Sequence, residues 1–168
     1  GVKNTLIGSL AGDVITTGSN NTSLGYESLS QAILPSYNTA LGSSALAGNV
    51  NGSENIAIGY KALYAMNPVS AANTYNIAIG NNAGIAVTTG VSNIFIGQNA
   101  GLIAAATNYN VAIGTAALSH DVLGSGSIAI GYQALEEQVP ASTSDVLNTA
   151  VGYQAGKVLT RTGASGST

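Results

Sequence analysis

A nine-residue pattern of polar and apolar positions recurs along the whole chain. Each copy reads Asn, an aliphatic residue or Thr, a usually small residue, an aliphatic residue, Gly, two variable positions, Ala, and Leu or Gly. The copies begin at Asn4, Asn21, Asn38, Asn55, Asn76, Asn93, Asn110, Ser127 and Asn148. Successive starts are seventeen positions apart, except for two intervals of twenty-one, so that three short units and one long unit form a super-repeat of seventy-two positions. A fixed period of this kind predicts an array of stacked coils.

The alternation inside each unit predicts a short β-strand. Ile56 and Ile58 are two residues apart, so they point to one side of a strand, and Ala57 points to the other. A strand that is apolar on both faces is usually buried on both. We expect the β-branched face to be covered by the other side of the same coil. A coil of seventeen residues has room for about two short strands at roughly 3.3 Å per residue, so we expect another chain to cover the Ala face.

Three positions of the unit are nearly invariant. Gly stands fifth in all nine units, which predicts a turn with positive φ or a close backbone approach. Ala stands eighth in all units but one, where Ser28 replaces it, and indicates tight packing. Asn opens eight units and predicts an amide ladder along the stack. The structural repeat positions singled out are Asn55, Ile56, Ile58, Gly59, Ala62, Asn76, Ile77, Ile79, Gly80, Ala83, Asn93, Gly97 and Ala100.

The segments between the units are less regular. Residues 14–18 (Val-Ile-Thr-Thr-Gly) return one super-repeat later as residues 86–90 (Ala-Val-Thr-Thr-Gly), and their β-branched residues favour a second, outer strand. The two long units carry Pro68 and Pro140, which are also one super-repeat apart. Because proline cannot donate to a strand ladder, we expect these insertions to be loops that bulge out of the stack without interrupting the inner strand.

Composition narrows the classes of partner. Charged residues make up 7% of the 168 residues, the net charge is −3, and there are four Lys and Arg in total, which is no footprint for nucleic acid. There is no run of 18 apolar residues, so we expect no membrane insertion. The chain has no cysteine, which excludes disulfides and thiolate metal sites. It begins at Gly1 rather than Met, and we expect it to be a segment of a longer fibre.

Candidate chemistry is sparse. His120 and Asp121 are adjacent, but adjacency alone does not make a catalytic triad, and a solvent-exposed turn is the simpler interpretation. Glu136 and Glu137 form a carboxylate pair in the second long unit, where the first has Tyr64 and an alanine, and a solvated loop is favoured. We therefore expect no catalytic residue, metal or cofactor, and no enzymatic activity.

Tyrosines fall on two repeat positions. One set holds the sixth position of its unit and consists of Tyr26, Tyr60, Tyr132 and Tyr153. The other set directly precedes the next Asn and consists of Tyr37, Tyr75 and Tyr109. Aromatic rows on a fibre can bind sugars or cell-surface polymers, or can shield the edges of coils and the grooves between chains. The sixth-position tyrosines are the candidate surface-binding residues.

Residues 55–63 (Asn-Ile-Ala-Ile-Gly-Tyr-Lys-Ala-Leu), 127–135 and 148–156 carry a family signal. They resemble the head repeat of trimeric autotransporter adhesins, a parallel β-roll of three chains. They also resemble the Asn-Thr-Ala-hydrophobic-Gly repeat of phage tail fibres, and the coil of seventeen residues, longer than that of the adhesin head, favours this second group. The resemblance covers residues 4 to about 156 and implies a trimeric fibre.

Together these observations predict an all-β fold, a parallel β-roll or β-solenoid of about nine coils, each seventeen to twenty-one residues long, in an intertwined or closely packed homotrimer. Residues 1–168 form a single repeat array, with super-repeats at 4–75 and 76–147 and a partial third. The expected function is a shaft or head of an extracellular, cell-surface or virion fibre, built as a homotrimer or filament, that contributes to attachment to a host glycan or protein receptor. The alternatives are an ice- or carbohydrate-binding solenoid and a polysaccharide depolymerase segment. The Thr residues that alternate with Ile at the second position are expected to face inward, against ice binding.

Overall fold

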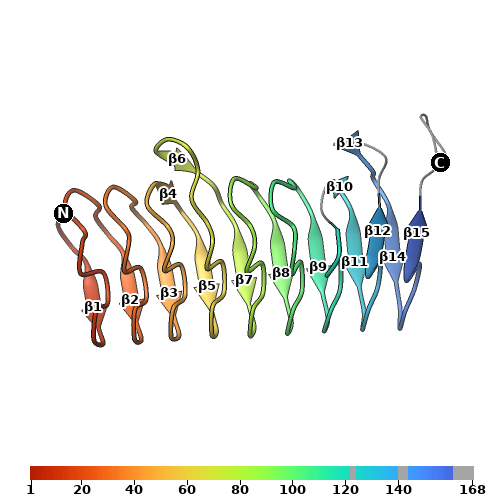
Figure 1. Cartoon of the computed structure of the whole chain (residues 1–168), viewed down its shortest axis with the longest axis horizontal. Coiled ribbons are helices and arrows are strands. Elements are labelled where there is room, and N and C mark those ends of the chain that lie inside the picture. Colours follow the sequence, from red (N-terminus) through yellow and green to blue (C-terminus); the bar gives the residue numbers. More distant parts are fainter. Residues whose placement is uncertain (122–123, 140–143, 161–168) are drawn as a thin grey trace.

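The computed structural model describes residues 1–121, 124–139 and 144–160 and shows a parallel β-solenoid of nine coils, with no helix in this part of the chain (Figure 1). One strand per coil joins a nine-stranded sheet that runs the length of the molecule. Its strands, in order, are β1 (Thr5–Ile7), β2 (Thr22–Leu24), β3 (Thr39–Leu41), β5 (Ile56–Ile58), β7 (Ile77–Ile79), β8 (Ile94–Ile96), β9 (Val111–Ile113), β11 (Ile128–Ile130) and β14 (Thr149–Val151).

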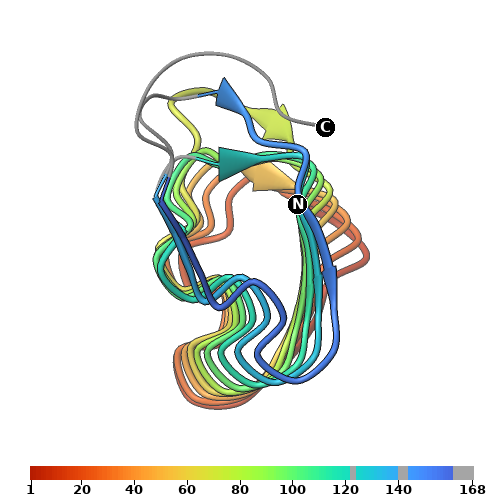
Figure 2. The same ribbon diagram turned by 90° about the vertical axis from the view of Figure 1, so that its right-hand side faces the viewer.

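The sheet follows the sequence repeat without a slip. Thr22 of β2 pairs with Thr39 of β3, and Ile56 of β5 pairs with Ile77 of β7 across one of the long units. Every coil, short or long, therefore advances by one strand, about 4.8 Å. The predicted β-solenoid with one coil per unit is confirmed. Figure 2, which looks along the stack, shows the coils superimposed on one outline.

The extra residues of the long units leave this outline. The long units carry the short strands β6 (Ala72–Asn73) and β13 (Ser144–Asp145), which pair with β4 (Gly52–Ser53) and β10 (Gly124–Ser125) at the ends of the preceding short coils. In both views the segments around β6 and β13 project beyond the other coils (Figures 1 and 2). Pro68 lies outside every strand, and Val69 beyond it is 95% exposed. The predicted bulge is confirmed at Pro68, and Pro140 lies outside the described residues. The last pair is β12 (Glu137–Val139) with β15 (Val158–Thr160).

The orientation of the inner strand is opposite to the prediction. Ala57, Ala78 and Ala112 are completely buried inside the coil, whereas their β-branched neighbours face outward and are half-buried or exposed. The Thr residues at the second position also face outward, so the expectation that they point inward is wrong. The physical reason is the width of the coil: the wall opposite the strand supplies its own Ala and Leu side chains, and the remaining space fits only a small residue.

Large and small residues compensate within this narrow core. Phe95 occupies the position that is Ala in most coils and is fully buried. The ninth positions beside it are glycines: a Cβ on Gly101 would lie 2.5 Å from a Phe95 ring carbon, and a Cβ on Gly84 would lie 2.9 Å from another. Four of the six coils with Ala on the strand carry a buried Leu at the ninth position instead, and these are Leu46, Leu63, Leu118 and Leu135.

The expected second strand in residues 14–18 and 86–90 is absent. These residues form turns and bends, although the stack still bonds through them, as when the Thr88 amide donates to the Ala105 carbonyl at 2.8 Å. Ile15 and Val87 pack against the core. Residues of positive φ lie on both sides of these segments, at Leu10 and Asn20 and at Asn82 and Ser92, so the backbone turns before and after each of them.

The asparagines form the predicted ladder. The Oδ1 of each Asn accepts the backbone amide of the equivalent residue in the next coil, as from Asn38 to Asn55 at 2.8 Å and from Asn76 to Asn93 at 3.0 Å. The Nδ2 of Asn76 donates across the coil to the Gly90 carbonyl at 2.7 Å. The same bond across the coil is made by Asn4, Asn21, Asn38, Asn93 and Asn110, so these side chains bridge two coils and two walls of one coil. These asparagines are almost completely buried, so the ladder satisfies backbone groups that water cannot reach.

Candidate interaction surfaces

The outward face of the long sheet is a continuous aliphatic strip, here called the aliphatic face. It has two columns, from the second and fourth positions of the unit. They comprise Thr5, Thr22, Thr39, Ile56, Ile77, Ile94, Val111, Ile128 and Thr149, and Ile7, Leu24, Leu41, Ile58, Ile79, Ile96, Ile113, Ile130 and Val151. None of the eighteen side chains is charged. At about 4.8 Å per strand the strip is roughly 40 Å long.

The fifth-position glycines position this face by stacking backbone on backbone. A Cβ on Gly97, whose φ is +132°, would lie 2.6 Å from the carbonyl carbon and oxygen of Gly114 in the next coil. Ala100 at the eighth position is fully buried, while Gln98 is exposed and Asn99 is half-buried. The two variable positions therefore lie on the surface, at the edge where the chain turns away from the aliphatic face.

The sixth-position tyrosines are exposed at this edge but have partners within the chain. Tyr132 and Tyr153 stack on each other with ring centroids 5.2 Å apart and planes inclined by 17°. The Lys61 Nζ lies 5.2 Å from the centroid of the Tyr60 ring. The neighbouring Glu27 carboxylate raises the pKa of the Tyr26 phenol by accepting its hydrogen bond. Some of the ring surface predicted to be available for a ligand is thus occupied by intramolecular contacts.

The tyrosines that precede the Asn lie on the other margin of the aliphatic face. Tyr37, Tyr75 and Tyr109 are 62%, 51% and 64% exposed. An open hollow beside the first of them is lined by Tyr37, Thr39, Glu54 and Ile56. The repeat pattern placed these tyrosines on one position, but it offered no reason to prefer them over the sixth-position set. The hollow depends on Thr39 and Ile56 facing outward, opposite to the expected orientation.

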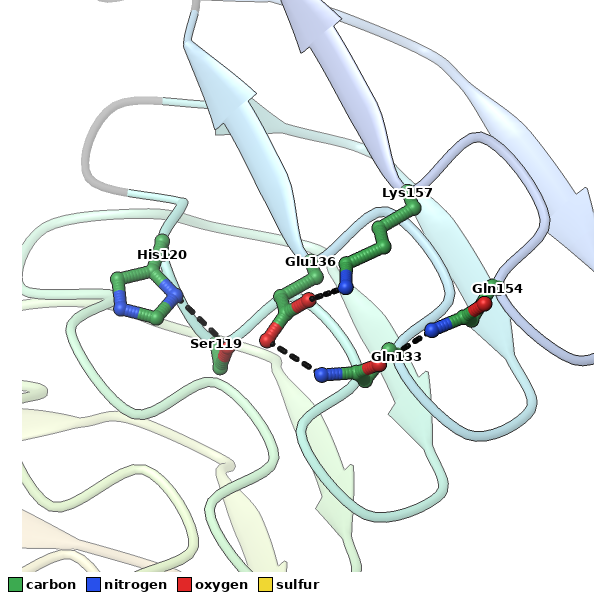
Figure 3. A network of polar contacts seen from close by, with 6 residues as sticks. All are labelled: Ser119, His120, Gln133, Glu136, Gln154 and Lys157. Carbon is green, nitrogen blue, oxygen red and sulfur yellow. Dashed lines mark hydrogen bonds and ion pairs between the residues drawn. The ribbon is translucent and has the colours of Figure 1, made fainter.

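The candidate catalytic pair is separated by the backbone. His120 is exposed and its Nδ1 lies 3.0 Å from the Ser119 Oγ, whereas Asp121 is fully buried inside the coil. Figure 3 shows the His120–Ser119 contact apart from the Glu136 network on the next coil. Because one side chain faces solvent and the other the interior of the coil, His120 and Asp121 do not form the His–carboxylate pair of a triad.

The carboxylate pair of the second long unit is also divided. Glu136 accepts a hydrogen bond from the Gln133 Nε2 at 2.8 Å and forms an ion pair with Lys157 at 3.3 Å. The Gln154 Nε2 continues the network by donating to the Gln133 Oε1 at 2.7 Å, which ties the last two coils together (Figure 3). Glu137 lies in β12. Within the described residues no three His, Asp or Glu side chains gather as metal ligands.

Comparison with protein-family models, with curated proteins and with solved structures finds no match. No helix in the described part of the chain has the length and apolar character needed to span a membrane. The function of the chain is therefore inferred from the geometry of its surfaces and from the sequence resemblance.

Proposed function

We propose that this chain is the shaft or head of a homotrimeric extracellular or virion fibre that contributes to attachment to a host or surface. The observation that carries the proposal is the aliphatic face, which runs uncovered along all nine coils of the chain. Soluble chains seldom leave a contiguous apolar patch of several hundred Å² exposed, and such patches usually mark an interaction surface.

The shape of the face favours copies of the same chain as the partner. Its side chains repeat at the strand spacing of the sheet, so another copy in parallel presents the same period along the whole length. Three such faces directed at one axis bury one another, and the repeat resembles families in which three chains associate. The mechanism is mechanical: backbone hydrogen bonds between all coils stiffen the rod, and repeated surface groups give many weak contacts that sum through multivalency.

The test compares charged substitutions on and off the aliphatic face. In the face variant, Ile77→Lys and Ile113→Lys put charges into the proposed interface, where an unpaired buried charge is costly. In the control, Gln98→Lys and Thr115→Lys add the same charges at the exposed sixth position. Sedimentation velocity should show that only the face variant loses the assembly. A face variant that sediments like the wild type would overturn the proposal.

A monomeric surface-binding solenoid is the second candidate. The observation that favours it is the outward column of Thr5, Thr22 and Thr39 on three successive coils of the long sheet, since regular rows of Thr suit ice binding. The row ends at Ile56, and five of the nine second positions are aliphatic. A folded wild-type monomer that inhibits ice recrystallisation would support this candidate, and a stable assembly without such activity would exclude it.

A further inference from the structure

We propose that Tyr37, Glu54, Tyr75 and Tyr109 form a binding row for an extended, neutral polysaccharide. The inference names a ligand class for the attachment role and to that extent rests on the proposed function. It differs from the sequence-based prediction, which placed surface binding on the sixth-position tyrosines.

The row has a regular spacing that comes from the coil repeat. Tyr37, Tyr75 and Tyr109 precede the Asn of the third, fifth and seventh coils, with Glu54 and Ser92 on the coils between. Aromatic rings therefore recur at every second coil, about 9.6 Å apart at two strand spacings. This distance is comparable with the disaccharide repeat of an extended β-1,4-linked chain, so alternate sugars meet a ring.

The backbone of the row is held in place, and its rings are open. Each tyrosine has positive φ, between 52° and 61°, and the amides of Tyr37 and Tyr109 donate to carbonyls of the preceding coil at 3.0 and 3.1 Å. The Tyr75 hydroxyl accepts a hydrogen bond from the Asn73 Nδ2 at 3.0 Å. No ring of the row stacks on another described side chain, in contrast to Tyr132 and Tyr153. The hydroxyl bond restrains the Tyr75 ring, and all three rings are exposed and can contact a ligand.

The hollow beside Tyr37 supplies both kinds of contact that a sugar needs. Tyr37 and Ile56 offer apolar surface, and Glu54 and Thr39 offer oxygen atoms to sugar hydroxyl groups. A sugar ring is apolar on its faces and polar at its edge, so it matches a wall of this composition. At the sixth-position edge, by contrast, Lys61 lies over the Tyr60 ring and Tyr132 stacks on Tyr153.

Charge favours a neutral ligand over an acidic one. Glu54 lies between Tyr37 and Tyr75, and the net charge of the chain is −3. The one cation at this repeat position in the nine coils is Lys3, two coils before Tyr37. An anionic polymer would meet like charge at the centre of the row, which disfavours binding.

The row is compatible with the proposed assembly. Thr39 and Ile56 belong to the aliphatic face, whereas the tyrosines lie along its margin. Partner chains that cover the face would also cover Thr39 and Ile56 of the hollow, so in the assembly the sugar contacts would come from the tyrosines and Glu54, which lie beside the groove between two chains. The same groove would then occur three times around the fibre, and a long polysaccharide chain would gain from multivalent contacts.

The test is affinity electrophoresis of the whole chain in gels that contain hydroxyethyl cellulose or glucomannan, with alginate as the anionic comparison. The row variant carries Tyr37→Asn, Tyr75→Asn and Tyr109→Asn, and should fold because Asn20 holds the same repeat position with a φ of 59°. The control carries Tyr26→Ser and Tyr60→Ser, since serine holds that position at Ser9 and Ser43. The neutral polymers should retard the wild type and the control, and the row variant should bind about tenfold more weakly or worse.

Absence of retardation by both neutral polymers, stronger retardation by alginate, or loss of binding in the control would each overturn the inference. A second measurement needs no variant: the affinity of the wild type for neutral β-1,4-linked oligosaccharides should rise with length up to the span of the row, about 19 Å over four coil spacings. Affinity that is independent of length would contradict the row. Light scattering on the same samples reports the assembly separately, so failure of the row and failure of the trimer are distinguishable.

Discussion

The two super-repeats solve the same structural problem with different residues. In a short coil the ladder Asn donates to the carbonyl fourteen positions on, but in the first long coil that residue is Val69, which lies in the protruding loop. In the first super-repeat Asn55 turns its Nδ2 to the Ser53 carbonyl at 3.2 Å and to the Asn38 Oδ1 at 3.1 Å. Its Oδ1 accepts the Thr74 hydroxyl at 2.8 Å. Met66 on the opposite wall is fully buried and apolar.

In the second super-repeat Ser127 stands at the ladder position and has no side-chain amide. Gln138, from the opposite wall of the coil, supplies an amide in its place. Gln138 stands where Met66 stands in the first, and its Nε2 lies 3.1 Å from both the Ser127 Oγ and the Asp121 Oδ2. Its Oε1 accepts the Asn148 Nδ2 at 2.7 Å. Val146 stands where Thr74 stands in the first super-repeat. The hydroxyl that donates to Asn55 there therefore has no counterpart beside Ser127.

The difference teaches that the ladder is a requirement on hydrogen bonds and not on asparagine itself. Asn49, Asn55, Met66 and Thr74 of the first super-repeat correspond to Asp121, Ser127, Gln138 and Val146 of the second. All eight are buried. A buried polar group without a partner costs about 1–3 kcal/mol, so each set is stable only as a whole.

The largest expected loss of stability comes from the fifth-position glycines, which both super-repeats share. Gly59→Val and Gly131→Val should each destabilise the chain by about 3 kcal/mol or more, because the φ values are +130° and +133° and a Cβ would lie 2.5 Å or less from a carbonyl oxygen of the next coil. Gln98→Ala, at the exposed sixth position, should change stability by less than about 0.5 kcal/mol. Thermal melting checks both, and equal effects would contradict the assignment of inside and outside.

The next largest loss is expected when the Gln138 network of the second super-repeat is removed. Gln138→Met should cost about 2–3 kcal/mol, because it removes at once the buried hydrogen bonds that Gln138 makes to the Ser127 hydroxyl, the Asn148 amide and the Asp121 carboxylate. Chemical denaturation measures the change in the free energy of unfolding. Leu118→Met, in a fully apolar part of the same core, is the matched control and should cost less than about 1.5 kcal/mol. Equal losses in the two variants would mean that the Gln138 network adds nothing beyond packing.

A smaller loss is expected from the reverse exchange. Met66→Gln should cost about 1–2 kcal/mol, because the first super-repeat already satisfies Asn55 and Asn76 and offers the new amide few free partners. The same denaturation experiment measures it. A gain in stability would show that the first arrangement, too, lacks a polar partner.

The smallest change in stability is expected when all four residues are exchanged together. The quadruple variant Asp121→Asn, Ser127→Asn, Gln138→Met and Val146→Thr installs the residues of the first super-repeat in the second. Its stability should lie within about 1 kcal/mol of the wild type, although Gln138→Met alone is costly, because residues of one hydrogen-bond network are not additive. Additive losses would show that the two sets are independent of their partners.

Much of the fold could be predicted from the sequence because the repeat fixes it locally. The strand of each unit, its parallel register, the Asn ladder and the bulge at Pro68 all follow from period and residue type. Which face of the strand points inward could not be predicted, because Ile56 and Ala57 are both apolar and alternation alone does not say which side is inner. The size match between Phe95 and the glycines beside it carries that information, but only after the coil is closed.

The candidate surfaces could be predicted only in part. The tyrosines fall on two repeat positions, and periodicity cannot show that Lys61 covers Tyr60 while Tyr37 borders a hollow. The pairing of Gln138 with Ser127 spans eleven residues and two walls of one coil, and it becomes visible as a correlated change only when the super-repeats are superimposed.

The central claim is that the aliphatic face is covered by copies of the same chain. The most direct test is the mass of the wild-type chain in solution by light scattering over a range of concentrations. The account predicts a stable species of three times the 16.6 kDa of one chain. A folded species that remains at the mass of a single chain at every concentration would contradict it.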